Sequence, residues 1–236
     1  MKITIQRESL EEFEADVHDV TLLSLLSTIK REQDNSLTFA SGCRSSVCGS
    51  CSMRVNGKEV LACSYKVSDG DLIEPLKNVP LIRDLVVDMD SAYEKNLKAK
   101  AWLSQITQGV QLSQENEKIN EIQSDCILCG SCYSACPVFS VNDNFMGPFA
   151  LTRVWKYVSD KREQSEQEKI DTIQTDGVWA CTLCNECTLV CPQDISSKAD
   201  IEKLRSKSAM AGYSDPNFAT FDSFGGGFGF DGSPSF

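Results

Sequence analysis

The sequence predicts an α+β protein of two modules, a small mixed module followed by an all-α one. The first supporting observation is the arrangement of its twelve cysteines, which fall into three groups of four along 236 residues. The second is a change near residue 90, where alternating apolar residues give way to helical periodicity. The third is an internal repeat, because DCILCGSCYSACP and ACTLCNECTLVCP align without gaps. We therefore expect domains at residues 1–90 and 91–211, with a Gly/Phe-rich tail over 212–236.

The first module shows the signals of a small sheet with one helix. Ile3 and Ile5 alternate with polar residues, which is typical of a half-buried strand. Asn56-Gly57 is a strong signal for a two-residue hairpin turn. Further signals are the alternation of Phe13, Ala15 and Val17, a helical face of Leu22, Leu25, Leu26 and Ile29 with Asp19 or Thr21 as its N-cap, and a short strand at Leu72 and Ile73.

The second module is predicted to be helical. Periodicity indicates helices over 91–106, 148–158 and 197–209. Pro148 stands at a first helical position, where its missing N–H is tolerated. Ser197 is the expected N-cap of the last helix. The tail contains FDSFGGGFGFDGSPSF, in which Gly, Ser and Asp predominate, so we expect little regular structure there.

The first cysteine group has the spacing C-x4-C-x2-C-x11-C, which is the plant-type ferredoxin pattern. Small residues in its loop, such as Gly42 and Gly49, let backbone N–H groups approach the sulfurs. We therefore predict an N-terminal plant-type ferredoxin (β-grasp) domain with one [2Fe–2S] cluster. Its predicted ligands are Cys43, Cys48, Cys51 and Cys63.

The other two groups each have the spacing C-x2-C-x2-C-x3-C followed by proline, which is the bacterial ferredoxin run. In two-cluster ferredoxins the fourth cysteine of such a run binds the cluster of the other run. We therefore predict an all-α, bacterial-ferredoxin-like domain with two [4Fe–4S] clusters that exchange their fourth ligands. Cys126, Cys129, Cys132 and Cys191 are assigned to one cluster, and Cys136, Cys181, Cys184 and Cys187 to the other.

Other uses of these cysteines explain less of the pattern. A zinc ribbon can use two C-x2-C pairs, but it accounts for neither the fourth cysteine before proline nor the duplication. A disulfide framework belongs to an oxidising compartment, and the acidic, strand-like N-terminus does not have the pattern of a signal peptide. The net charge of −11 argues against nucleic-acid binding. No apolar run has the length that a membrane-spanning helix needs.

The segment SLTFASGCRSSVCGSCSMRVNGKEVLAC resembles the [2Fe–2S] region of the iron–sulfur subunit of succinate dehydrogenase and fumarate reductase. PLKNVPLIRDLVVDMD is similar to the linker between the modules of that family, and the two later cysteine runs occupy the expected places. The resemblance covers about residues 1–203. It implies an electron-transfer subunit of an oxidoreductase complex.

The same resemblance implies partners and a location. One expected partner is a flavoprotein subunit that interconverts succinate and fumarate at FAD, and the other is a quinone-reactive, membrane-associated anchor subunit. The chain is then expected to catalyse nothing alone, because the hydride chemistry belongs to the flavin. It is expected to lie peripherally on the cell membrane through its complex, on the cytoplasmic side.

Two departures from familiar members refine this interpretation. Familiar members have another residue in place of Cys184 and a [3Fe–4S] third centre, so this thiol predicts a second [4Fe–4S] cluster of lower potential. They also have a tryptophan-rich stretch and a histidine where this chain has residues 138–141 and Thr182, and both contribute to quinone binding there. The combination resembles a branch with a cysteine-rich anchor subunit akin to that of heterodisulfide reductase. That branch includes methylmenaquinol-dependent fumarate reductases and non-heme succinate dehydrogenases.

Two further hypotheses are a subunit of a related oxidoreductase and a protein of another class. The alternative function is the iron–sulfur subunit of a thiol-driven fumarate reductase or of a heterodisulfide-reductase-like complex, which the missing quinone residues motivate. In the remaining hypothesis the clusters only brace the fold of a binding protein. Three clusters exceed what bracing a chain of this size requires.

Overall fold

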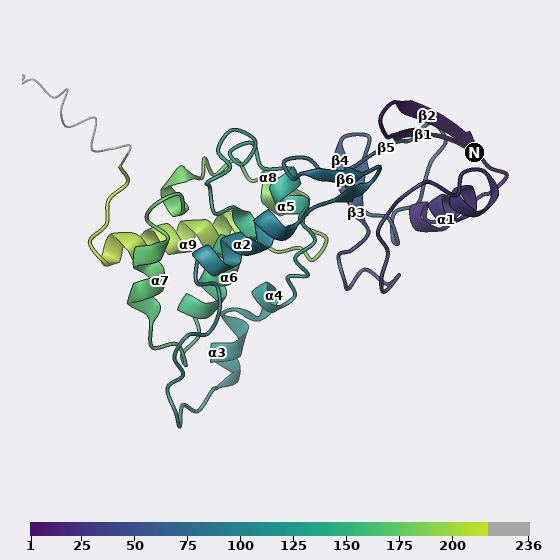
Figure 1. Cartoon of the computed structure of the whole chain (residues 1–236). Coiled ribbons are helices and arrows are strands. Elements are labelled where there is room, and N and C mark those ends of the chain that lie inside the picture. The colour runs from purple at the N-terminus through teal and green to yellow at the C-terminus, as the bar shows by residue number, and fades with distance from the viewer. Residues whose placement is uncertain (217–236) are drawn as a thin grey trace, which may run out of the picture.

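The computed structural model describes residues 1–216. Most of the tail predicted over 212–236, from residue 217 onward, lies outside the described residues. The strands gather at one end of the molecule with helix α1, and the remaining helices form the other end (Figure 1). Two separate apolar cores correspond to these two ends. The structure therefore has the mixed module followed by the helical module that the sequence predicts.

The mixed module contains a five-stranded sheet in the order β2-β1-β5-β3-β4. Strands β1 and β5 run parallel, whereas the other neighbouring pairs are antiparallel. The predicted Asn56-Gly57 hairpin turn joins β3 and β4, with φ of 51° and 82° at its two residues. The strands are β1 (Lys2–Gln6), β2 (Leu10–Glu14), β3 (Ser52–Val55), β4 (Lys58–Leu61) and β5 (Leu72–Glu74).

Helix α1 (Leu22–Glu32) buries its apolar face in the core of the mixed module. Of the two candidate N-caps, Thr21 takes the role, because its side chain accepts a hydrogen bond from the Ser24 N–H at 3.3 Å. The strand predicted through Val17 ends earlier, at Glu14. Beyond Glu14 the pairing reaches only Ala15, whose N–H donates to the Met1 carbonyl at 3.0 Å, because the Val17 N–H turns back to the Ala15 carbonyl at 3.0 Å.

A short two-stranded sheet, β6 (Leu81–Arg83) with β7 (Val86–Val87), lies in the linker between the modules. Asp84 at its turn is buried and accepts hydrogen bonds from Arg7 Nε at 2.9 Å and from the Thr38 N–H at 2.7 Å. The linker is therefore fastened to the mixed module before the helical module begins.

Within residues 1–216, four longer helices and several short ones build the helical module. The main pair is α6 (Pro148–Val158) and α9 (Ser197–Met210), which pack against each other. The predicted bounds 148–158 are confirmed, with Pro148 in the first turn. The other helices are α2 (Asp90–Lys98), α3 (Gln114–Lys118), α4 (Glu121–Ser124), α5 (Ser131–Ser134), α7 (Glu166–Thr172), α8 (Glu186–Leu189) and the 3-10 turn η1 (Val178–Ala180).

The prediction of a helix over 91–106 is wrong, because α2 ends at Lys98. Lys100 adopts a left-handed backbone with φ of 51°. The Ala101 N–H donates to the Asn96 carbonyl at 2.9 Å and the Lys100 N–H to the Leu97 carbonyl at 3.1 Å. These two bonds form a Schellman motif, which terminates the helix.

A distant side chain holds the segment that follows α2. Lys169 on α7 is fully buried, and its ammonium group donates to the carbonyls of Lys100 and Trp102 at 2.9 and 2.6 Å. The same group lies 3.3 Å from the buried carboxylate of Glu163. Those two carbonyls therefore accept hydrogen bonds from Lys169, a contact that helical periodicity does not reveal.

The expected N-cap at Ser197 is also wrong by one residue. Ser196 occupies the cap position, and Ser197 is the first residue of α9. Its side chain is 4% exposed. Because its backbone is already part of the helix, Ser197 cannot be the cap, whose backbone lies outside the helix.

Candidate metal centres

The first cysteine group lies in the loop before β3 and just after β4. Four backbone N–H groups point at its sulfurs: Cys43 N–H at Cys48 Sγ, Ser45 N–H at Cys43 Sγ and Ser46 N–H at Cys63 Sγ, each at 3.3 Å, and Val47 N–H at Cys43 Sγ at 3.4 Å. Such donors stabilise negative charge on sulfur. The loop is therefore arranged to hold thiolates.

The backbone of this loop is wound tightly around the sulfurs. Arg44 and Ser46 have positive φ of 59° and 62°, a conformation uncommon outside glycine. At Gly42 a Cβ atom would lie 2.8 Å from Cys48 Sγ, so no side chain fits there. These contortions aim consecutive N–H groups inward, as a cluster-binding loop requires.

The pKa values of the thiols in this group diverge. N–H donors from Ser45 and Val47 lower the pKa of Cys43 to about 6, whereas burial raises the pKa of Cys51 to about 11. Cys63, whose sulfur also interacts with Cys51, belongs to the same cluster of thiols. The loop thus favours thiolate most strongly at its exposed end.

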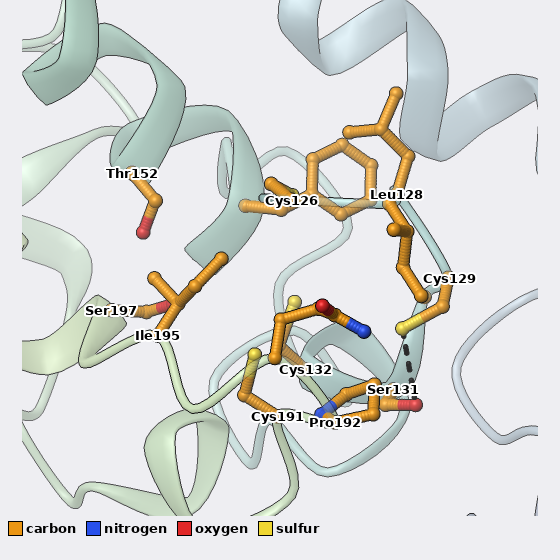
Figure 2. A pocket seen from close by; sticks show the side chains of 14 residues that line it. Cys126, Leu128, Cys129, Ser131, Cys132, Thr152, Cys191, Pro192, Ile195 and Ser197 are labelled. Carbon is orange, nitrogen blue, oxygen red and sulfur yellow. Dashed lines mark hydrogen bonds between the residues drawn. The ribbon is translucent and has the colours of Figure 1, made fainter. Parts of the chain in front are cut away.

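In the helical module, four sulfurs line one cavity: those of Cys126, Cys129, Cys132 and Cys191 (Figure 2). Cys126 and Cys129 come from the loop leading into α5, Cys132 comes from α5 itself, and Cys191 comes from the end of the second cysteine run, after α8. Cys136, the fourth cysteine of the first run, is not among the residues lining this cavity. The fold therefore brings together the four cysteines of the predicted exchanged set.

The remaining four cysteines also lie near one another. Burial, followed by the charges of Cys181, Cys136 and Cys184, raises the pKa of Cys187 to about 12. Burial raises the pKa of Cys136 too, with further contributions from Cys181 and Cys184. Cys136 and Cys187 are buried, whereas Cys184 is exposed. The second set is thus assembled from both runs, with one thiol at the surface.

The internal repeat of the sequence is also a repeat of backbone conformation. Leu128 and Leu183, the third residues of the two runs, have φ of 53° and 57°. Gly130 and Asn185, which precede α5 and α8, have φ of 82° and 75°. A left-handed leucine costs about 1–2 kcal/mol, so its occurrence at both equivalent positions indicates a functional geometry.

The three sets follow one another through the molecule. A Cβ atom at Gly49, in the first loop, would lie 2.8 Å from the Cys129 Cβ. Gln193, two residues after Cys191, donates to the Ser46 carbonyl at 3.1 Å. Cys132 in turn feels the charge of Cys187 in the last set. The four cysteines that line the cavity therefore lie between the other two groups of four.

Sequence reasoning missed the residues that join the modules. Asn78 in the linker donates from its amide to the carbonyls of Tyr133, Ser134 and Cys136 at 3.0 to 3.2 Å. Ser131, beside Cys129, shares a buried hydrogen bond of 2.9 Å with Ser52. The sequence signal for Asn78 was its place in a Pro-flanked linker, which marks a turn but names no partner.

The donor chemistry fits clusters of iron and sulfide. All twelve cysteines are free thiols. Within residues 1–216, no three His, Cys, Asp or Glu side chains converge on one metal ion. The thiols instead surround a shared cavity or approach one another in fours, and thiolates around N–H donors are the usual ligands of iron–sulfur clusters.

Comparisons with known proteins agree with this geometry. Residues 2–94 match the family model of a 2Fe-2S iron-sulfur cluster binding domain, and residues 122–195 match that of a 4Fe-4S dicluster domain. One solved structure, the Mycobacterium smegmatis Sdh1 complex in the apo form, contains a chain with the same fold at a TM-score of 0.81. The match covers 91% of this chain and 98% of that one, with 23% identity.

Two curated relatives are similar in sequence. The 8-methylmenaquinol:fumarate reductase iron-sulfur subunit of Wolinella succinogenes is 40% identical over 205 residues, which cover 80% of this chain and 64% of that one. The fumarate reductase iron-sulfur subunit of Mycobacterium tuberculosis is 35% identical over 199 residues, which cover 80% and 81%. This chain thus spans less than two thirds of the length of the first relative.

A 2Fe-2S domain followed by a 4Fe-4S dicluster domain defines an iron–sulfur protein of electron transport. Within that class, the chain belongs to the family of iron–sulfur subunits of fumarate reductase and succinate dehydrogenase. In the described part of the chain, no helix combines the length and the apolar character needed to cross a membrane.

Proposed function

We propose that this chain carries electrons between a flavoprotein that interconverts succinate and fumarate at FAD and a quinone-reactive anchor subunit. The observation that carries the proposal is the cavity lined by the sulfurs of Cys126, Cys129, Cys132 and Cys191. These four thiolates are the proposed ligands of one [4Fe–4S] cluster. The proposed domains are residues 1–90, 91–211 and the tail 212–236.

The other two sets complete a wire of three centres. Cys43, Cys48, Cys51 and Cys63 are the proposed ligands of a [2Fe–2S] cluster, and Cys136, Cys181, Cys184 and Cys187 those of a second [4Fe–4S] cluster. Each cluster, when bound, exchanges single electrons. The loop containing Gly49 touches Cys129, so the first two centres are neighbours.

The chain's own groups prepare these sites for charged clusters. N–H groups of the first loop stabilise the thiolates, and burial around Cys132 and Cys187 excludes water from the later centres. Asn78 and Ser131 fasten the linker and the mixed module to α5 and its loop. The proposed role of the fold is therefore to keep three sites in a fixed order.

The last centre supports a proposal about the membrane partner. Where familiar members carry quinone-binding residues, Phe139 is buried against Tyr133, with ring centroids 4.6 Å apart, and Thr182 carries no ring. We therefore infer that the anchor is a cysteine-rich subunit, as in the branch with methylmenaquinol specificity. The complex is proposed to lie on the cytoplasmic side of the cell membrane.

The test is electron flow through the complex purified with its flavoprotein. Cys48→Ala removes one ligand of the first centre, and we expect succinate-dependent quinone reduction to stop while the helical module stays folded. Ser45→Ala in the same loop keeps all four thiols and its backbone N–H donor, and it serves as the control. Unchanged turnover in Cys48→Ala, or failure to co-purify with a flavoprotein, would contradict the proposal.

The alternative, a thiol-driven fumarate reductase or heterodisulfide-reductase-like subunit, is not favoured. One relative that this chain covers over 81% of its length, from Mycobacterium tuberculosis, is named as a fumarate reductase iron-sulfur subunit, without reference to thiols. Fumarate reduction by a dithiol, with no turnover of any quinol, would reverse this preference.

A further inference from the structure

A buried carboxylate lies beside the cavity of the proposed [4Fe–4S] cluster of the first cysteine run and is not one of its proposed ligands. Asp200 on α9 is 1% exposed. One oxygen, Oδ1, accepts a hydrogen bond from Gln123 Nε2 on α4 at 2.8 Å and lies 3.3 Å from Lys203 Nζ. A buried carboxylate with one partly exposed cation is costly for a fold, so its presence calls for a functional explanation.

The surroundings of Asp200 contain polar atoms that the protein leaves without partners. Within the described residues, Asp200 Oδ2, Gln123 Oε1, Thr152 Oγ1 and Trp155 Nε1 are all buried and form no hydrogen bond of normal geometry. Lys203 Nζ lies 5.0 Å from the ring centroid of Trp155 and 3.3 Å from Asp200 Oδ1, so Trp155 and Asp200 both lie near Lys203. The site is therefore polar and only half satisfied.

Thr152 connects this polar site to the cavity. Its side chain lines the cavity together with the four sulfurs (Figure 2). Its hydroxyl also lies close enough to the Asp200 carboxylate to lower the pKa of that group, although the two do not form a hydrogen bond of normal geometry. Asp200 is thus separated from the proposed cluster by a single residue that contributes no charge.

We propose that the Asp200 carboxylate tunes the reduction potential of the cluster held by Cys126, Cys129, Cys132 and Cys191, and that it takes up a proton when this cluster is reduced. The inference rests on the proposed cluster at these cysteines. One electron enters through the wire and one proton enters from water, so the added negative charge is balanced.

The sign of the effect follows from charge. An ionised Asp200 adds negative charge beside the cluster, favours its oxidised state and lowers its potential. By reciprocity, reduction of the cluster favours protonation of the carboxyl group. Burial raises the pKa of Asp200, opposed by Lys203, Gln123 and Thr152, so proton exchange moves toward neutral pH.

Other charged groups on neighbouring elements have partners of their own. Glu166 of α7 pairs with Lys207 at 2.6 Å, and Arg205 donates to the carbonyls of Val178 and Cys181. Gln123 from α4 and Thr152 from α6 are uncharged. Among residues 1–216, Lys203 is therefore the cation that opposes protonation of Asp200.

The experiment is a redox titration of the intact complex, followed by EPR, between about pH 5 and pH 8. We expect the wild-type potential of this cluster to fall as pH rises. Asp200→Asn keeps the shape of the side chain and should raise the potential at pH 8, with a three- to tenfold higher reduced-to-oxidised ratio at fixed potential, up to about 59 mV. The pH dependence should flatten.

Asp194→Asn is the matched control. Asp194 is exposed, three residues after Cys191, and its left-handed backbone with φ of 54° suits asparagine. Water screens its charge, so its removal should leave the potential unchanged. A pH-independent wild-type potential, or equal potentials in the Asp200→Asn and Asp194→Asn complexes, overturns the inference while the cluster signal still supports the proposed function. Absence of any [4Fe–4S] signal overturns both.

Discussion

At the scale of single residues, the close approach of backbone to cysteine decides which side chains are tolerated. Gly49 has φ of 72°, and a Cβ atom there would lie 2.8 and 2.9 Å from the Cβ and Cα atoms of Cys129. Gly70 has a similar φ of 84°, but a Cβ atom there would meet nothing within 4 Å. The two glycines thus separate the effect of backbone conformation from the effect of contact.

We predict that Gly49→Ala destabilises the protein more than Gly70→Ala does. Both substitutions cost about 1–2 kcal/mol because alanine must adopt a left-handed backbone. Only Gly49→Ala also pushes the first cysteine loop away from the loop that contains Cys129. The free energy of unfolding from denaturant titration measures the difference. Equal losses for the two variants would show that the loops are not in contact.

A second residue-scale prediction concerns the buried pair of Lys169 and Glu163. Lys169→Met leaves the Glu163 carboxylate buried without its cation, so we expect a loss of about 3–5 kcal/mol of stability. Lys207→Met removes an exposed ion pair with Glu166 and should lose less than about 1 kcal/mol. Denaturant titrations of both variants at neutral pH check this, and similar losses would contradict it.

The same pair gives a pH dependence. Burial pushes the pKa of Glu163 up, but N–H donors of Ser104 and Ser165 and the charge of Lys169 outweigh it, so the pKa is lowered from its ordinary 4.5. The stabilisation is therefore present above pH 4.5 and is lost as pH falls through the lower pKa of the folded state. Glu163→Gln should reduce this loss of unfolding free energy at acid pH. If the unfolding free energy of the variant falls with pH as in the wild type, Glu163 does not cause the loss.

At the scale of elements, the two cysteine runs are equivalent in conformation but not in surroundings. Gly130 and Asn185 occupy the same left-handed position before α5 and α8. A Cβ atom at Gly130 would lie 2.7 Å from Met89 Cε, and the Asn185 side chain makes no capping hydrogen bond. The first run is therefore packed against the linker.

The reciprocal exchange of these two residues should have unequal effects. Asn185→Gly removes the strain of a left-handed backbone at a residue with a side chain. We expect it to leave stability unchanged or to raise it by up to about 1 kcal/mol. Gly130→Asn must displace Met89 and should cost about 1–3 kcal/mol. Thermal unfolding of both variants tests this, and symmetric effects would mean that the runs have the same surroundings.

The elements also show how far sequence reasoning reaches. The bounds of α6 and the Asn56-Gly57 turn depend on local residues, and the structure has both as predicted. The segment that follows α2 is held by Lys169, about 70 residues away in the chain, and helical periodicity does not reveal that contact. Asn78 similarly acts on α5 carbonyls more than fifty residues away.

The proposed ligand sets rest on more local information than the bounds of the helices around them. Cysteine spacing determines which loops can wind around a cluster, and this is local information. The proposed exchange of Cys136 and Cys191 between runs was inferred from the duplicated pattern, and Cys191 lines the same cavity as the cysteines of the first run. The polar site at Asp200 arises from the packing of α4, α6 and α9, for which no motif exists.

At the scale of the whole molecule, Cys184 distinguishes two versions of the wire. With its thiol, the proposed last centre is a [4Fe–4S] cluster, and the oxidised, anaerobically purified complex should show no [3Fe–4S] EPR signal. Cys184 is exposed, so Cys184→Ala should leave the fold intact and create that signal. A stoichiometric [3Fe–4S] signal in the undamaged wild-type complex would refute the assignment.

The central claim is that the two cubanes exchange their fourth ligands across the repeat. The most direct measurement compares the EPR signals of reduced complexes carrying Cys126→Ser, Cys181→Ser or Cys191→Ser. If the ligands are exchanged, Cys191→Ser perturbs the same cluster signal as Cys126→Ser and leaves the signal altered by Cys181→Ser unchanged. If Cys191→Ser instead perturbs the signal altered by Cys181→Ser, each run holds its own cluster and the claim is wrong.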